Sequence, residues 1–330
     1  MRNATFEEMA ECIRDAETFA VCGHVNPDGD SIGSVLGMVH TLRMMGKTAT
    51  PLLANTSKVP LRYHFLEASD EFEFADRFEG TPDVFIAVDV PNNERLGDAN
   101  AVLARSRKSI AIDHHPYDGV KSDLLLCDPT AASATMLVWE MARVLVGTPS
   151  AEIARACYAG LLTDSGRFQF QNTDARALAA AGEFVAAGAD PAIVATEVYQ
   201  NRRLPSIRLE GRMIERITVV GSRLVAYSWV DEPDFEELGA KREDMEGLVD
   251  TIRSIEGIEV ALLVQGRKKD VRFSIRAKRG VDVSRIAERF GGGGHRAAAG
   301  FTLTGTLAER REDIVALIEG IERELAEGLN

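Results

Sequence analysis

The chain of 330 residues has no apolar run that approaches the roughly 18 residues of a membrane-spanning helix. Its first 17 residues are polar and acidic, which is not the composition of a secretory signal. The sequence therefore predicts a cytoplasmic protein that does not enter a membrane. Cysteine is scarce and forms no C-x-x-C pair, so we expect free buried thiols in a reducing compartment. The cysteines are Cys12, Cys22, Cys127 and Cys157.

Internal repeats, low-complexity segments and the C-x5-R loop of cysteine-dependent phosphatases are also missing. The length is sufficient for about two globular domains. Basic residues are outnumbered, with 38 Lys and Arg against 51 Asp and Glu, for a net charge of −13. Such a surface repels long duplex nucleic acid. One segment has the opposite charge, because residues 260–296 hold ten basic residues against three acidic ones. A local basic patch on an acidic protein favours a small phosphorylated ligand.

The most informative stretch follows the apolar run 19–22, which predicts a short buried strand. Within seven residues it supplies His24, Asp28 and Asp30, directly before apolar positions spaced for one face of a helix. Open α/β sheets place ligands at turns of this kind, and an imidazole with two carboxylates suits a divalent Mn, Mg, Fe or Zn ion. A polar turn with an Asx cap is the alternative interpretation.

Further ionisable groups follow other apolar runs. Residues 84–88 precede Asp89, and residues 109–112 precede Asp113, His114 and His115. A helical stretch around 94–105 separates the two runs, which is typical of β-α-β units in a parallel sheet. The helix over 151–162 leads to Asp164. Strand ends in a parallel sheet meet at one edge, so we expect these groups to converge. Because converging buried carboxylates are costly without cations, the pattern predicts a bound metal pair.

The pattern changes after residue 216, where two hairpins are expected over 217–230 and 259–275. In the second hairpin Arg272, Ser274 and Arg276 alternate and therefore share one face of a strand. Four glycines at 291–294 and then His295 follow a helix expected over 283–290. Glycines permit close approach to a phosphate, although a flexible linker is the alternative.

Taken in order, these motifs resemble those of the DHH/DHHA1 phosphoesterase family over nearly the whole chain. The matching motifs are His24-Val25-Asn26-Pro27-Asp28-Gly29-Asp30, Val88-Asp89, Asp113-His114-His115-Pro116, Thr163-Asp164-Ser165-Gly166, and Gly291 to Gly300 with His295. The length and the lack of extra domains are most similar to the stand-alone nanoRNases and pAp phosphatases of the family.

The resemblance implies two divalent cations, with Mn²⁺ preferred and Mg²⁺ or Co²⁺ as alternatives. It assigns His24, Asp28 and Asp89 to one ion, and Asp30, Asp89, His114 and Asp164 to the other, so that Asp89 bridges. Asp113 is expected to orient His114, and His115 to face the substrate phosphate. The implied substrate-binding residues are Ser274, Arg276, Gly293, Gly294 and His295, to which strand periodicity adds Arg272.

The expected fold is α/β, with a parallel-sheet DHH domain flanked by helices and a smaller α/β DHHA1 domain, and the active site in the cleft between them. The expected bounds are 1–190 for the catalytic domain, 191–212 for a helical linker and 213–330 for the substrate-binding domain.

The expected activity is hydrolysis of RNAs of 2–5 nucleotides to 5′-mononucleotides, and of pAp to AMP, by a hydroxide activated by two metals. Alternatives are a cyclic or linear dinucleotide phosphodiesterase, an inorganic pyrophosphatase and an inactive nucleotide-binding sensor. A homodimer also stays open.

Overall fold

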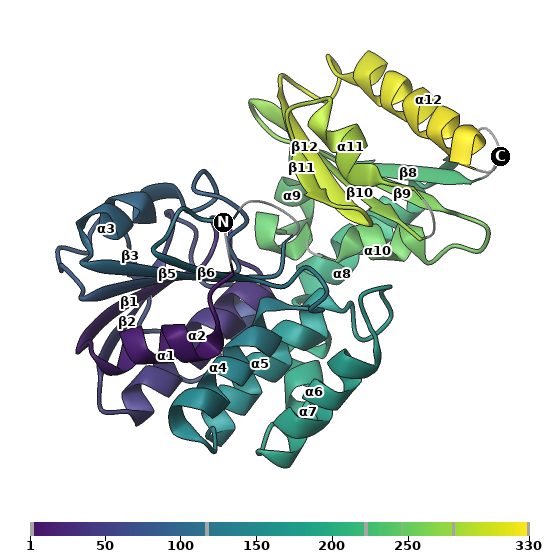
Figure 1. Cartoon of the computed structure of the whole chain (residues 1–330). Coiled ribbons are helices and arrows are strands. Elements are labelled where there is room, and N and C mark those ends of the chain that lie inside the picture. Colours follow the sequence, from purple (N-terminus) through teal and green to yellow (C-terminus); the bar gives the residue numbers. More distant parts are fainter. Residues whose placement is uncertain (1–2, 116–118, 221–223, 246, 279–280, 329–330) are drawn as a thin grey trace. The chain divides into compact units, whose positions relative to one another are not determined.

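The computed structural model describes residues 3–115, 119–220, 224–245, 247–278 and 281–328. The chain divides into two compact units, Met1–Asn201 and Arg202–Asn330, each of which has its own sheet (Figure 1). Among the described residues no single helix combines the length and apolarity needed to cross a membrane, although the bent pair Ala175–Ala186 and Pro191–Gln200 passes by length and composition.

The sheet of the first unit has the strand order β3-β2-β1-β4-β5-β6, and every neighbouring pair is parallel. Its central strands are buried along almost their whole length, as a sheet covered on both faces requires. This confirms the expected parallel sheet. The strands are β1 (Thr18–Cys22), β2 (Thr48–Leu53), β3 (Glu73–Phe74), β4 (Val84–Val88), β5 (Lys108–Asp113) and β6 (Leu124–Cys127).

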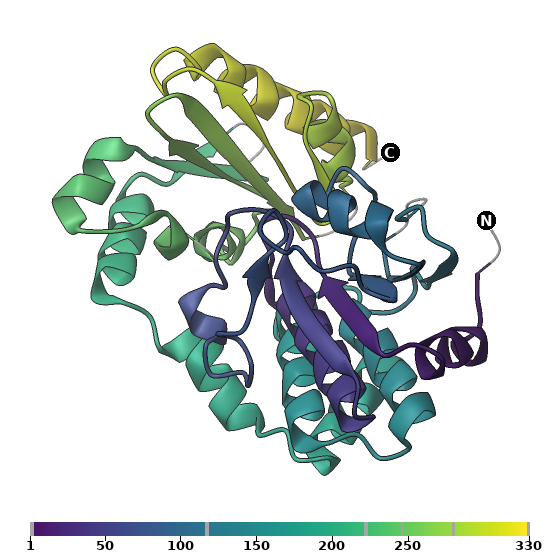
Figure 2. The same cartoon turned by 90° about the vertical axis from the view of Figure 1, so that its left-hand side faces the viewer.

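Helices cover both faces of this sheet. Figure 1 shows α3 on one side and α1, α2, α4 and α5 on the other, and Figure 2 shows the same layers turned by 90°. Nearly all of α2 is buried. The helices are α1 (Phe6–Arg14), α2 (Gly29–Met44), α3 (Asn100–Arg105), α4 (Ala134–Val146), α5 (Ala151–Asp164), α6 (Ala175–Ala186) and α7 (Pro191–Ala195), with short 3-10 turns at Leu61–Tyr63 and Gly97–Ala99.

The helical segment that follows α6 is interrupted at a different residue from the one that the sequence predicts. The pattern places an interruption at Pro205, but Pro205 lies in the first turn of α8 (Leu204–Glu215), where a missing N–H costs nothing. The break falls instead at residues 201–203, directly after a π-helical turn at Thr196–Gln200. The boundary between the two units along the chain falls within this break, between Asn201 and Arg202.

The second unit is a mixed sheet of order β11-β12-β10-β9-β8-β7, in which β8 and β9 pair in parallel. The two expected hairpins, β7–β8 and β9–β10, are confirmed. The strands are β7 (Thr218–Val220), β8 (Val225–Val230), β9 (Val260–Gly266), β10 (Asp270–Ala277), β11 (Gly293–His295) and β12 (Ala298–Thr304). The helices are α9 (Glu232–Leu238), α10 (Leu248–Arg253), α11 (Val283–Glu288) and α12 (Arg311–Gly328), with a 3-10 turn at Arg242–Met245.

The glycine run is structured rather than a linker. Gly293 and Gly294 belong to β11 and pair with Gly300 and Ala299 of β12. A Cβ on Gly292 would lie 2.3 Å from the Gly300 carbonyl oxygen, and one on Gly294 would lie 2.4 Å from that of Ala298. The sequence needs glycine here because two backbones approach closely.

The four cysteines form no disulfide, as expected. Cys22 and Cys157 are buried, whereas Cys12 and Cys127 are half-buried, so the expectation of burial holds for two of them.

Candidate metal centre

The turn between β1 and α2 brings His24 and Asp28 together. Gly23 permits this turn, because a Cβ at that position would lie 1.9 Å from Ser31 Oγ. Asp28 caps α2, since its Oδ1 accepts the backbone N–H groups of Asp30 and Ser31 at 3.1 Å. Its other oxygen, Oδ2, lies 3.6 Å from His24 Nε2. The cap interpretation is therefore confirmed for Oδ1, and Oδ2 remains available as a candidate metal ligand.

Ser31 lies in a G-x-S-x-G sequence, Gly29 to Gly33, a pattern associated with nucleophilic serines. Ser31 is fully buried in the first turn of α2. Its Oγ accepts the backbone N–H of His24 at 3.2 Å. The serine therefore fixes the turn that carries the metal-type ligands, and its hydroxyl is not presented as a nucleophile.

Asp30 is held by the first turn of α4. Its two carboxylate oxygens accept the backbone N–H groups of Ala134 at 2.6 Å and Thr135 at 3.0 Å. A helix N-terminus stabilises a carboxylate, so this buried side chain is oriented before any ion binds. Gly160 of α5 leaves room for it, because a Cβ there would lie 2.9 Å from Asp30 Oδ1.

Asp89 lies at the centre of the cluster, directly after β4. Its Oδ2 is 3.6 Å from His24 Nε2, and its Oδ1 is 3.5 Å from His114 Nε2. The backbone of Asp89 is left-handed, with φ 59°, a conformation that costs energy for a residue other than glycine. A hydrogen bond of 3.0 Å from its N–H to the Ile112 carbonyl oxygen holds the backbone in place.

His114 completes the second group of candidate ligands. Its Nε2 lies 3.6 Å from Asp30 Oδ2 and 3.8 Å from Asp164 Oδ2, in addition to the contact with Asp89. Its Nδ1 lies 3.2 Å from the Ala131 carbonyl oxygen, which sets a tautomer with Nε2 unprotonated and facing the carboxylates.

The expectation that Asp113 orients His114 is wrong, because Asp113 contacts His115 instead. Its Oδ1 accepts from Nδ1 of His115 at 2.8 Å, while the Ala131 carbonyl fixes the tautomer of His114. The error has a simple cause, because adjacent residues project in different directions and Asp113 still belongs to β5. Pro116, the last residue of that motif, lies outside the described residues.

The distances within the cluster fit metal ligation better than direct hydrogen bonding. Hydrogen bonds between these groups would be about 2.7–3.0 Å long, whereas the nitrogen–oxygen separations are 3.5–3.8 Å. Ligands bonded to one ion at about 2.1 Å lie ~3–3.5 Å apart, close to the observed spacing. Three groups have ligand atoms within 4.8 Å of one another: His24, Asp28, Asp89; Asp30, His114, Asp164; and Asp89, His114, His115. The first two share no residue and are therefore compatible with two separate ions.

The electrostatics also favour cations in this cluster. Burial disfavours the imidazolium of His24, but Asp28 and Asp89 outweigh it and raise the pKa of His24 to about 9. Burial, followed by repulsion from Asp89, raises the pKa of Asp30 to about 7. The pKa of Asp164 is raised as well, first by burial. The carboxylates therefore hold more negative charge than two imidazoles can balance, and bound cations would remove this conflict.

The expected substrate-binding residues all lie in the second unit. Along β10 the half-buried Arg272, Ser274 and Arg276 alternate with buried residues, which confirms that they share a face. Burial lowers the pKa of the Arg276 guanidinium, whose Nη1 donates to the Ile275 carbonyl oxygen at 3.0 Å. The backbone of His295 lies in β11 beside Gly293 and Gly294, whereas its side chain lies outside the described residues.

Two features near the ligands were not anticipated from the sequence. Arg95 places Nη2 at 3.2 Å from Nδ1 of His24. After Asp164, three successive residues, Gly166, Arg167 and Phe168, are left-handed with φ 57°, 63° and 61°. The only sequence signals were the Asn92-Asn93 pair before Arg95 and the glycine at 166, and neither predicts a contact.

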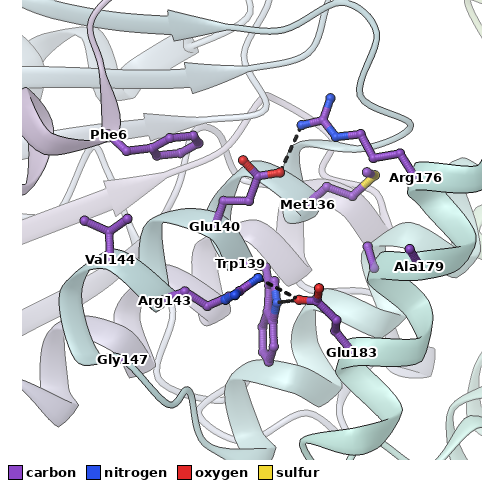
Figure 3. Close-up of a pocket in the computed structure, with 11 residues that line it drawn as sticks. Phe6, Met136, Trp139, Glu140, Arg143, Val144, Gly147, Arg176, Ala179 and Glu183 are labelled. Atoms are coloured by element: carbon purple, nitrogen blue, oxygen red, sulfur yellow. Dashed lines mark hydrogen bonds and ion pairs between the residues drawn. The ribbon is translucent and has the colours of Figure 1, made fainter.

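A separate groove of about 540 Å³ lies in the first unit among α1, α4 and α6 (Figure 3). Its charged groups are paired with each other. Glu183 accepts from Trp139 Nε1 at 2.8 Å and from Arg143 Nη1 at 3.1 Å, and Arg176 donates to Glu140 at 3.0 Å. These pairs join neighbouring helices, so we assign the groove a role in packing rather than in catalysis.

Two protein-family models match this chain, one in each unit. A model described as the DHH family N-terminal domain matches residues 18–161, and one described as the DHHA1 domain matches residues 222–324. The bifunctional oligoribonuclease and PAP phosphatase NrnA of Thermus thermophilus is 31% identical over 96% of this chain and 93% of its own length. The Bacillus subtilis protein of the same name is 27% identical over 90% of this chain and 92% of its own length.

A solved structure shares the fold. The exopolyphosphatase-related protein from Bacteroides fragilis has a TM-score of 0.89 and 23% sequence identity, with coverage of 96% of this chain and 95% of that one.

Proposed function

Because the chain belongs to the DHH family and carries both a DHH and a DHHA1 domain, we propose that it is a metal-dependent phosphoesterase that cuts short oligoribonucleotides to 5′-mononucleotides and dephosphorylates pAp to AMP. The observation that carries this proposal is the position of Asp89, whose two oxygens face two imidazoles from different strand ends. The bifunctional relatives from Thermus thermophilus and Bacillus subtilis support the substrate class.

The donor set suits two divalent cations. His24, Asp28 and Asp89 would hold one, and Asp30, His114 and Asp164 the other, with Asp89 shared. Mixed imidazole and carboxylate donors fit Mn²⁺, which we propose as the native ion, with Mg²⁺ or Co²⁺ as substitutes. When bound, the pair would supply Lewis-acid chemistry, by lowering the pKa of the attacking water and offsetting the charge that develops at phosphorus.

The chain's own residues do the positioning. The N–H groups of α4 orient Asp30, and the Ala131 carbonyl orients His114, so neither ligand needs to reorganise during turnover. Asp113 holds the proton of His115 on Nδ1, which leaves Nε2 as the ring nitrogen that would face the substrate. We propose that His115 contacts the phosphate through Nε2, and that Asp113 fixes the orientation of the ring for this contact.

The second unit is the proposed substrate-binding part. Ser274 and Arg276, together with Gly293, Gly294 and His295, would bind the nucleotide, and Arg272 lies on the same face of β10. We retain the proposed division into a catalytic domain over 1–190, a helical linker over 191–212 and a substrate-binding domain over 213–330. The net charge of −13 favours a short substrate over a long duplex.

Turnover assays test the proposal. Purified protein with Mn²⁺ should release AMP from pAp and mononucleotides from the linear dinucleotide pApA. Replacing Asp89 by Asn preserves size but removes the bridging charge, so both rates should fall by more than ~100-fold, beyond the loss typical for an outer-sphere partner. Asp98→Asn is the matched control, because Asp98 is exposed and belongs to neither group of ligands.

Other substrates separate this function from its alternatives. Preferential turnover of cyclic di-AMP would identify a second-messenger phosphodiesterase, and preferential turnover of pyrophosphate an inorganic pyrophosphatase. Binding of pAp without product, with Mn²⁺, Mg²⁺ and Co²⁺ each tested, would identify a sensor and contradict the proposal.

A further inference from the structure

Arg95 is a half-buried cation beside a metal-type ligand, and neither group of ligands includes it. Its Nη2 lies 3.2 Å from Nδ1 of His24. In the part of the chain that the structure describes, no carboxylate forms an ion pair with this guanidinium. Arginine side chains in such surroundings usually pair with an acid, and this one lies beside a cluster rich in aspartates without doing so.

The backbone of Arg95 is fixed against the β1–α2 turn. Its carbonyl oxygen accepts the N–H of Val25 at 2.8 Å, and its own N–H donates to Asn92 Oδ1 at 3.0 Å. Gly97 closes the loop with φ 53°, and a Cβ there would lie 2.5 Å from the Ala54 carbonyl oxygen. The loop that follows Asp89 therefore delivers Arg95 to this position with little freedom.

The hydrogen bond that His24 Nδ1 makes to the backbone determines what the guanidinium can do. Nδ1 lies 2.9 Å from the Val25 carbonyl oxygen, which favours a proton on Nδ1. The lone pair is then on Nε2, where it faces Asp28 and Asp89 as a metal ligand must. In that state Nδ1 has no lone pair for Arg95 to donate to, so the N–H donors of Arg95 remain for an anion.

We propose that Arg95 is a phosphate-binding residue contributed by the first unit, which donates to non-bridging oxygens of the phosphoryl group at the metal centre. This inference rests on the proposed phosphoester substrate. The planar guanidinium can donate two parallel hydrogen bonds to a phosphate and does not lose its charge. The guanidinium of Arg95 also places a positive charge where an anionic substrate must approach the aspartates of the cluster. These are Asp28, Asp30, Asp89, Asp113 and Asp164.

Phosphate binding and turnover, measured together, test this role. The variants are Arg95→Gln and Arg95→Lys, with Arg107→Gln as control, since Arg107 is 79% exposed and pairs with Asp83 at 3.1 Å. Titration calorimetry gives the affinity of each protein for Mn²⁺, and then the affinity of the Mn²⁺-loaded protein for inorganic phosphate. Steady-state assays give kcat and KM for pAp.

We expect Arg95→Gln to weaken phosphate binding and to lower kcat/KM by ~10–100-fold, the loss typical of a charge-assisted hydrogen bond. Its Mn²⁺ affinity should stay within about threefold of the wild-type value, Arg95→Lys should recover part of the loss, and Arg107→Gln should match the wild type. A merely structural role, in which Arg95 only orients His24, would instead weaken Mn²⁺ binding and leave phosphate binding unchanged.

Absence of phosphate binding by the wild type, or equal binding by Arg95→Gln, would overturn the inference. Failure of the proposed function has a different signature. If the wild type turned over neither pAp nor pApA but Arg95→Gln still lost phosphate affinity, Arg95 would remain an anion contact of a site with another substrate.

Discussion

Oδ1 of Asp89 lies 3.5 Å from Nε2 of His114, while Oδ2 of the same carboxylate lies 3.6 Å from His24. One side chain thus joins two groups of ligands, and this predicts how metal stoichiometry responds to its loss. The wild type should bind two Mn²⁺ ions per chain and Asp89→Asn at most one, with reduced affinity, as measured by calorimetry and elemental analysis. Two ions of unchanged affinity in the variant would show that Asp89 does not bridge.

The contact between Asp113 and His115 predicts a variant that keeps its metal but loses rate. Asp113→Asn should lower kcat for pAp by ~10–100-fold, the range for an outer-sphere partner, because the amide no longer fixes the orientation and tautomer of His115 through a charge-assisted hydrogen bond. Mn²⁺ stoichiometry should stay at the wild-type value, since the Ala131 carbonyl orients His114.

A double variant checks this pairing. If Asp113 acts through His115, combining Asp113→Asn with His115→Gln should be no worse than His115→Gln alone. Additive losses, or loss of metal in Asp113→Asn, would return Asp113 to the role first expected beside His114.

The close packing around Gly33 and the open space around Gly182 predict opposite effects for two glycine-to-alanine changes. A Cβ on Gly33 would lie 2.4 Å from the Ala156 carbonyl oxygen, so Gly33→Ala should cost about 1–3 kcal/mol of unfolding free energy. Gly182, inside α6, is exposed and a Cβ there meets nothing within 4 Å, so Gly182→Ala should stabilise by about 0.4–1 kcal/mol. The urea midpoint for unfolding of the first unit, measured on the full-length protein, reports both changes in stability. Equal shifts for the two variants would contradict the packing argument.

A buried carboxylate in the second unit predicts an acid-dependent loss of stability. Burial by itself raises the pKa of Asp234, but hydrogen bonds from Arg216, the Asp231 backbone and Arg212 outweigh it and hold that pKa below its usual value. A carboxyl group with a depressed folded pKa contributes stability above its unfolded pKa of about 3.9 and loses it as the pH falls further.

Replacing Asp234 by Asn should therefore cost about 1–3 kcal/mol at pH 7, and less below pH ~4. Urea midpoints from pH 3 to 7 measure this. Glu237→Gln is the matched control, because Glu237 bonds the same Arg212 but is 63% exposed, and such surface pairs contribute little. A cost for Asp234→Asn that does not vary with pH would contradict the assignment.

The sequence was sufficient to predict the parallel sheet and the convergence of the candidate ligand side chains. Apolar runs that end in Asp89 and Asp113 imply parallel strands, and the topology of such a sheet brings their ends to one edge. The short strands β3 and β6 went unpredicted because two and four residues are too few to show a period.

The contacts that were missed depend on tertiary placement. The pairing of Asp113 with His115 depends on how β5 ends, and the bond from His114 joins it to Ala131, 17 residues away. Arg95 reaches His24 across 71 residues, through a loop whose position depends on Gly97. No periodicity in the sequence encodes such contacts.

One carboxylate oxygen of Asp28 caps α2, and the other lies 3.6 Å from His24 Nε2 in the proposed metal centre. Asparagine caps a helix about as well as aspartate, but it brings no negative charge. Folding and chemistry at this residue are therefore separable by a single change of oxygen to nitrogen. We expect Asp28→Asn to keep the fold and to lose the proposed hydrolase activity. This variant is therefore suited to capturing an uncleaved nucleotide in a crystal.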